Sequence, residues 1–241
     1  MTALQGSIGA LNDVVDAPRD AVGKPSKPLP SGLVSPQVAR LIVVAGLAVG
    51  LGLSALLGPG VFAIALLGVA IGYAYDLRLK GTIWAWLPFA LGIPLLPVYA
   101  WYGAAGAIPP GFVVLLPAAI LTGAALALGN QLADLAHDRV SGTPSTVRLL
   151  GARASWALMA ALYAGVLLVA IGSLAALGAR GWGAVLAWAG AAAVVAGVLA
   201  ARRGGDVRGL RARAWELQAA GIGLLAAGWI AALAGTPTLS G

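Results

Sequence analysis

Long apolar runs separated by short polar segments dominate the chain. A bilayer-spanning helix needs about 20 predominantly apolar residues. Seven segments approach that length and are expected to be helical: Val38–Leu57, Val61–Tyr75, Ile83–Tyr102, Phe112–Ala133, Ala154–Leu177, Trp182–Ala201 and Ala214–Leu233. The pattern predicts an all-α transmembrane bundle that forms one membrane-embedded domain over residues 1–241, with a remnant of another helix at residues 1–16. Prolines within the spans predict kinks or breaks at Pro88, Pro94, Pro97 and Pro117.

Composition agrees with this pattern. Hydrophobic residues make up 60% of the chain and charged residues only 10%, and the mean hydropathy is +0.93. A soluble domain is about half apolar and roughly a quarter charged. The chain contains no cysteine, which excludes disulfides and thiolate metal sites. The sequence therefore predicts an integral membrane protein.

The basic residues predict how the chain is oriented. All of them except Arg180 fall in four alternate segments between spans, which are residues 12–40, 76–82, 134–153 and 202–213. Cytoplasmic segments carry the excess of Lys and Arg. We therefore expect a multi-pass protein of the cell membrane with these segments in the cytoplasm, and the last one, Arg202 to Arg213, against anionic lipid. Orientation explains the basic charge better than nucleic-acid binding does, and no nucleic acid is predicted as a partner.

One polar spacing occurs twice in a chain that has only eight acids. It consists of an Asn followed by Asp residues four and eight positions later, at Asn12, Asp16 and Asp20 and again at Asn130, Asp134 and Asp138. Such residues line one face of a helix, and aligned carboxylates repel unless a cation lies between them. Mg²⁺ binds through one or two carboxylates together with substrate phosphates. The repeat predicts two half-sites of a metal–diphosphate clamp, with the remaining phosphate charge neutralised by Arg19, Lys24, Lys27, Arg78, Lys80 and Arg139.

These motifs also carry a family resemblance that covers nearly the whole chain. "NDVVDAPRD" fits an NDxxDxxxD signature, "KPSKPLPSG" resembles KPxRPLPSG, "YDLRLK" resembles YxxxLK, and "NQLADLAHD" resembles a second DxxxD motif. Together and in this order they resemble the UbiA superfamily of intramembrane prenyltransferases. The resemblance implies a nine-helix bundle whose active site opens at the cytoplasmic face.

The resemblance also implies a chemistry. An isoprenyl diphosphate ionises with Mg²⁺ as cofactor, and an electron-rich acceptor attacks the allylic cation. Carried over by position, the metal ligands are Asn12, Asp13, Asp16, Asp20, Asn130, Asp134 and Asp138. The diphosphate contacts are Lys27, Tyr75 and Lys80, and Arg139 joins them as a basic neighbour of the second motif. The catalytic set comprises Asp16, Asp20, Asp134, Asp138 and Lys80.

The chain departs from the family pattern near its start. Only eleven residues precede Asn12, so we expect the first family helix and most of the second to be missing, through a misplaced initiation codon or because the sequence is a fragment. A chain this short could bind lipid poorly or be inactive. Pro18 is expected to strain a continuous helix, and Lys27 replaces an Arg of the family motif, which removes a bidentate fork.

Several assignments have simpler alternatives. Asp13 lies off the stripe and could be a cap, Arg78 and Lys80 could be topology anchors, and Tyr75 could be an interfacial aromatic residue. His137 lies off the ligand stripe and is read as a solvated histidine. Repeated polar motifs and prolines within helices also describe secondary transporters, although carriers place charged groups near the bilayer midplane and here they lie at helix ends.

The acceptor is the least determined feature. "HDRVSGTPSTVRLLG" resembles the segment after the second motif in quinone-forming members, which favours an aromatic acceptor in quinone biosynthesis. A glycerol-phosphate lipid or a tetrapyrrole is the alternative. The bilayer surrounds the protein, and no protein partner is predicted.

Overall fold

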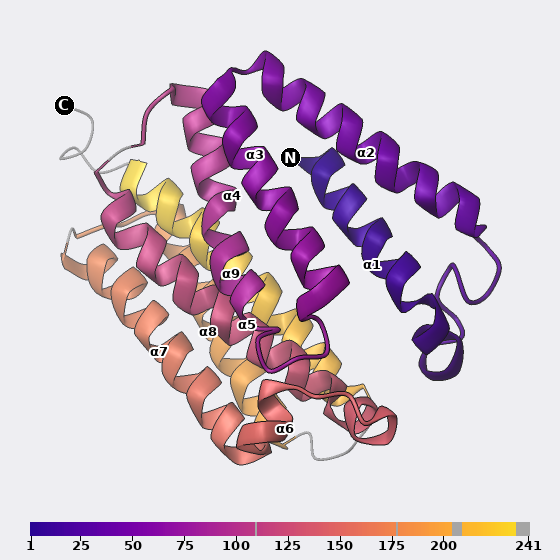
Figure 1. Ribbon diagram of the computed structural model, residues 1–241. Helices are drawn as coiled ribbons and strands as arrows, with labels where there is room; N and C mark the ends of the chain where they lie inside the picture. The colour runs from indigo at the N-terminus through magenta and orange to yellow at the C-terminus, as the bar shows by residue number, and fades with distance from the viewer. Residues whose placement is uncertain (109, 177, 204–208, 235–241) are drawn as a thin grey trace. The chain divides into compact units, whose positions relative to one another are not determined.

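The computed structural model describes residues 1–108, 110–176, 178–203 and 209–234, and over them it is built of helices (Figure 1). The elements are α1 Thr2–Gly23, α2 Pro36–Leu56, α3 Pro59–Ala74, the π-helix η1 Tyr75–Leu79, α4 Leu87–Ala105, α5 Phe112–Ser141, α6 Thr146–Leu150, α7 Ala152–Ala176, α8 Trp182–Arg203 and α9 Leu210–Ala234. Leu177, Asp206 and Arg208 of the sequence interpretation lie outside the described residues.

Six helices of the described part are long and apolar enough to cross a membrane. They are α2, α3 with its continuation to Leu79, α4, α5, α7 and α8. The seventh expected span forms α9, whose first turns carry the charged residues Arg211, Arg213 and Glu216. Length and composition thus support a multi-pass membrane protein.

Two helix boundaries differ from the expectation. α1 continues past residue 16 to Gly23 and includes Pro18, the residue expected to strain a continuous helix. The helix retains hydrogen bonds beyond it, and Lys24 N donates to Asp20 O over 2.7 Å. α4 begins at Leu87 and not at Ile83, which places Pro88 in the first helical turn, where a missing N–H costs no hydrogen bond.

The chain forms two compact units, and the first comprises residues 1–81 and 91–112. Within it α1 lies directly against α2, because glycines of α2 leave room for the α1 backbone. A Cβ atom at Gly46 would lie 2.7 Å from Ala3 O, and one at Gly50 would lie 2.3 Å from Leu4 Cδ2. Leu4 is buried in a core with residues of α3 and α4. This packing fixes the helix that carries the first Asn/Asp motif.

The second unit comprises residues 82–90 and 113–241. Its α8 and α9 run side by side (Figure 1), and again glycines allow the contact. A Cβ atom at Gly190 would lie 2.3 Å from Leu225 N. α5 contributes Leu128, Leu132 and Leu135 to the buried core of this unit, so the helix that carries the second motif is held along its length.

Candidate active site

The first Asn/Asp motif lies on one stripe of α1, as its spacing predicts. Asp16 and Asp20 are buried, with 8% and 7% of their surface exposed, and Asn12 is half-buried. Buried carboxylates need partners, because desolvation strongly disfavours an isolated charge. Their surroundings therefore show what this stripe is built to hold.

Two lysines supply the partners. Lys27 Nζ lies 2.7 Å from Asp20 Oδ2 and 3.0 Å from Asp13 Oδ1, and Lys80 Nζ pairs with Asp16 Oδ2. Partial burial lowers the pKa of Lys27, but the hydrogen bonds to Asp20 and Asp13 outweigh it and hold the pKa above its ordinary value of 10.5. The structure thus brings together five predicted site residues. They are Asp13, Asp16 and Asp20 of α1, Lys27 of the following loop and Lys80 of the segment after α3.

The π-helix after α3 places the remaining residues of this cluster. Lys80 N donates to Tyr75 O over 2.8 Å, five residues back, which is the π-helical bond. Lys80 Nζ lies 5.7 Å from the centroid of the Tyr75 ring. Arg78 is exposed and Asp76 is buried, so the turn buries one of its two charges and leaves the other at the surface.

Asp76 is a site residue for which the sequence interpretation gave no role. Its Oδ1 accepts a hydrogen bond of 2.8 Å from Asn12 Nδ2, across a separation of 64 residues. The available signal was an acid directly after an apolar span in a chain with few acids. Sequence spacing could not reveal the contact, because it depends on how α1 packs beside the end of α3.

The second motif belongs to the other compact unit and lies near the end of α5. Asn130, Asp134 and Asp138 share one helix face by their spacing, and all three are half-buried. Arg139 is exposed, and the off-stripe His137 is half-buried. The neighbouring Gln131 Oε1 accepts from Val147 N over 3.3 Å, which ties α6 to this end of α5.

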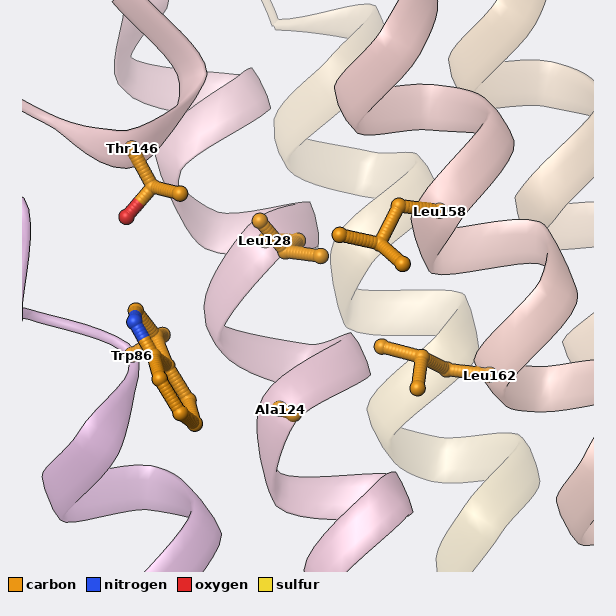
Figure 2. Close-up of a pocket in the computed structure, with 6 residues that line it drawn as sticks. All are labelled: Trp86, Ala124, Leu128, Thr146, Leu158 and Leu162. Carbon is orange, nitrogen blue, oxygen red and sulfur yellow. The ribbon is translucent and has the colours of Figure 1, made fainter. Parts of the chain in front are cut away.

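An apolar cavity of about 200 Å³ lies beside α5 in the same unit. Figure 2 shows its lining: the Trp86 ring lies on one side, Leu158 and Leu162 of α7 lie on the other, and Leu128 and Ala124 of α5 lie between them, with Thr146 of α6 at one end. Thr146 Oγ1 donates to Ile83 O over 2.8 Å. The cavity can accommodate an apolar group. One residue of its lining, Leu128, lies two residues before Asn130 on the chain.

Comparison with protein families matches residues 1–217 to the UbiA prenyltransferase family. The chain belongs to this family. The resemblance carried by the ordered motifs is thereby confirmed.

Solved structures agree with the UbiA fold. A UbiA homolog from Aeropyrum pernix K1, solved in its apo form, superposes with a TM-score of 0.75 at 23% identity, covering 96% of this chain and 86% of that one. A UbiA homolog from Archaeoglobus fulgidus, solved bound to GPP and Mg²⁺, gives a TM-score of 0.64 at 20% identity, covering 95% and 84%. The all-α UbiA-type fold expected from the sequence is confirmed.

Curated relatives of this UbiA chain come from two groups of synthases. A digeranylgeranylglyceryl phosphate synthase of Methanopyrus kandleri is 45% identical over 73 residues, which are 30% of this chain and 27% of that protein. A chlorophyll synthase of Oryza sativa is 32% identical over 172 residues, covering 66% and 46%. The chain thus spans less than half the length of these curated relatives.

The side chains of the UbiA motifs fit a hard divalent cation. Asn and Asp offer only oxygen ligands, which suit Mg²⁺. Among the described residues, no three Asp, Glu, His or Cys side chains converge as a ready metal site. In the first unit the carboxylates that could converge face the ammonium groups of Lys27 and Lys80. Lysine ammonium groups thus contact the carboxylates that the motif predicts to be metal ligands.

Proposed function

We propose that this chain is an Mg²⁺-dependent intramembrane prenyltransferase, which moves an isoprenyl group from an isoprenyl diphosphate to an acceptor. One observation carries the proposal: buried carboxylates of α1 and two lysines from different segments form one cluster at a helix end. A structural ion pair does not need this set, whereas a metal–diphosphate complex needs both acids and cations. Membership in the family supports the same activity.

Each group in the cluster has a task in this reaction. Asn12, Asp13, Asp16 and Asp20 would hold one Mg²⁺, and Asn130, Asp134 and Asp138 would hold another. When bound, the metal would supply Lewis-acid stabilisation of the departing diphosphate. Lys27 and Lys80 would exchange their carboxylate partners for phosphate oxygens. Tyr75 would be a further contact of the diphosphate, and Arg139 would supply positive charge beside the second motif. The carboxylates released by the lysines would then be available as metal ligands, so we expect the site to bind metal and diphosphate together in preference to metal alone.

The acceptor belongs to this proposal as well. The expected aromatic acceptor of quinone biosynthesis is not confirmed by the relatives, whose names refer to a glyceryl phosphate and to chlorophyll. We favour the glyceryl phosphate lipid on the strength of the 45% identity to the Methanopyrus kandleri synthase. An aromatic ring and a tetrapyrrole are the competing acceptors.

Release of inorganic diphosphate from geranylgeranyl diphosphate by purified protein tests the activity. We expect release that depends on Mg²⁺ and is abolished in Asp16→Ala and in Asp134→Ala, because each removes a metal ligand. Glu216→Ala is the matched control, since Glu216 is an exposed acid outside both motifs. A wild-type chain that moves the diphosphate across vesicles without cleaving it would identify a carrier instead.

A second assay decides the acceptor. Membranes are incubated with labelled geranylgeranyl diphosphate and a geranylgeranylglyceryl phosphate, a hydroxybenzoate, a dihydroxynaphthoate or a chlorophyllide, and the products are identified by mass. We expect the glyceryl phosphate to be prenylated. Transfer to an aromatic ring alone would restore the quinone assignment and leave the activity standing.

A further inference from the structure

Asp76 has an environment that its position on the chain does not explain. Only 3% of its surface is exposed, and it lies in the π-helical turn between Tyr75 and Lys80. Oδ1 accepts from Asn12 Nδ2 over 2.8 Å, and Oδ2 is buried with no hydrogen-bond partner in the described part of the chain. A buried carboxylate is costly, so a purely structural contact between α1 and this turn is better made by neutral groups.

The chemistry of the contact restricts Asn12 to one orientation. An Asn side chain has a donor end, Nδ2, and an acceptor end, Oδ1, and only Oδ1 can bind a cation. An ionised carboxylate only accepts hydrogen bonds, so Asn12 must turn Nδ2 toward Asp76. Its Oδ1 then points away from Asp76. Without an acceptor at this position, the amide could turn over and present its NH₂ group to the metal.

The same stripe shows why an orienting group is needed at Asn12 and not at its neighbours. The carboxylates of Asp16 and Asp20 offer an acceptor oxygen whichever way they rotate, whereas the amide offers one in only one of its two orientations. Hydrogen bonds that involve an ionised group are also about twice as strong as neutral ones. An acid is therefore the side chain that holds an amide ligand most firmly.

We propose that Asp76 is a positioning residue, which holds the Asn12 amide with Oδ1 directed to the Mg²⁺–diphosphate complex. The inference rests on the proposed function and adds a residue to that site. Asp76 acts through Asn12 and does not itself bind the metal. Partners that orient a metal ligand change metal affinity by about 10- to 100-fold when they are removed.

Two substitutions separate orientation from charge. Asp76→Leu removes the acceptor and retains much of the volume, whereas Asp76→Asn removes the charge and keeps an oxygen that can accept from Asn12 Nδ2. Binding of Mn²⁺ with inorganic pyrophosphate to the full chain in detergent is followed by electron paramagnetic resonance. We expect Asp76→Leu to weaken Mn²⁺ binding by about 10-fold or more. Asp76→Asn should weaken it less, because its amide still offers an oxygen to Asn12 Nδ2 but can also turn over and donate.

A double-mutant cycle tests whether Asp76 acts through Asn12. In an Asn12→Ala background, Asp76→Leu should cause no further loss of Mn²⁺ affinity, because no amide remains to be oriented. A melting temperature measured without metal shows whether Leu is tolerated, and Asp76→Ala replaces it where it is not. Losses that add in the double variant would overturn the proposal.

The remaining outcomes also discriminate. If Asp76→Asn weakens Mn²⁺ binding as much in the Asn12→Ala background as in the wild-type background, the charge acts directly on the metal and the positioning role is wrong. If wild type and Asp76→Leu bind Mn²⁺ and pyrophosphate equally well, the positioning role is wrong and the proposed function stands. If wild type binds no Mn²⁺ even with pyrophosphate, the proposed function fails and the role of Asp76 fails with it.

Discussion

At the scale of single residues, Lys27 links the charge balance of the site to stability. Its ion pairs with Asp20 and Asp13 raise the pKa above 10.5. A lysine whose pKa is raised by folding stabilises the protein fully below its unfolded pKa, and this contribution is lost as the pH rises through the folded pKa. Replacing the lysine should therefore cost stability at neutral pH and progressively less at alkaline pH.

We predict that Lys27→Gln lowers the melting temperature in detergent at about pH 8 and that the difference from wild type narrows by about pH 11. Arg19→Gln is the control, because Arg19 is an exposed cation of α1 and arginine stays protonated throughout this range. Its effect should be small and independent of pH. An effect of Lys27→Gln that stays constant between the two pH values would show that the ion pairs do not stabilise the fold.

At the scale of helices, close packing depends on glycines at defined positions. A Cβ atom at Gly228 of α9 would lie 2.3 Å from the backbone nitrogen of Ala187, whereas one at Gly223 of the same helix meets nothing within 4 Å. Small residues let membrane helices approach at such positions. The pair offers a test of packing in which the chemical change is identical.

We predict that Gly228→Ala destabilises the second unit by about 1–3 kcal/mol through overpacking. Gly223→Ala should be neutral or stabilise by up to about 1 kcal/mol, since alanine is the better helix former. Thermal unfolding in detergent, followed by circular dichroism, measures both. Equal melting temperatures for the two variants would contradict the close contact between α8 and α9.

The elements also show how far sequence patterns reach. Apolar runs located the spans because length and hydropathy are local properties. They did not predict that α1 continues through Pro18 or that Ile83–Trp86 precede α4, since both depend on which hydrogen bonds the ends can form. The Asn/Asp stripe of α1 was predictable from spacing alone. The contact between Asn12 and Asp76 was not, because it requires knowing which helices are neighbours.

At the scale of the whole molecule, the distribution of charge predicts one orientation in the membrane. All basic residues but Arg180 lie in alternate connections, and the positive-inside rule places those connections in the cytoplasm. Both Asn/Asp motifs border these connections. The orientation therefore also determines from which side of the membrane the diphosphate headgroup and Mg²⁺ reach the motifs.

The chain contains no cysteine, so single introduced thiols report their own side of the membrane. Ser141 ends α5 beside the second motif, and Ala107 follows α4 at the opposite end of the expected topology; both are exposed. We predict that a membrane-impermeant maleimide labels Ala107→Cys in intact cells and Ser141→Cys only in inverted vesicles. Labelling of both from one side would contradict the alternating topology. If the two sides were exchanged, the helices would stand, but the site would open away from the cytoplasm.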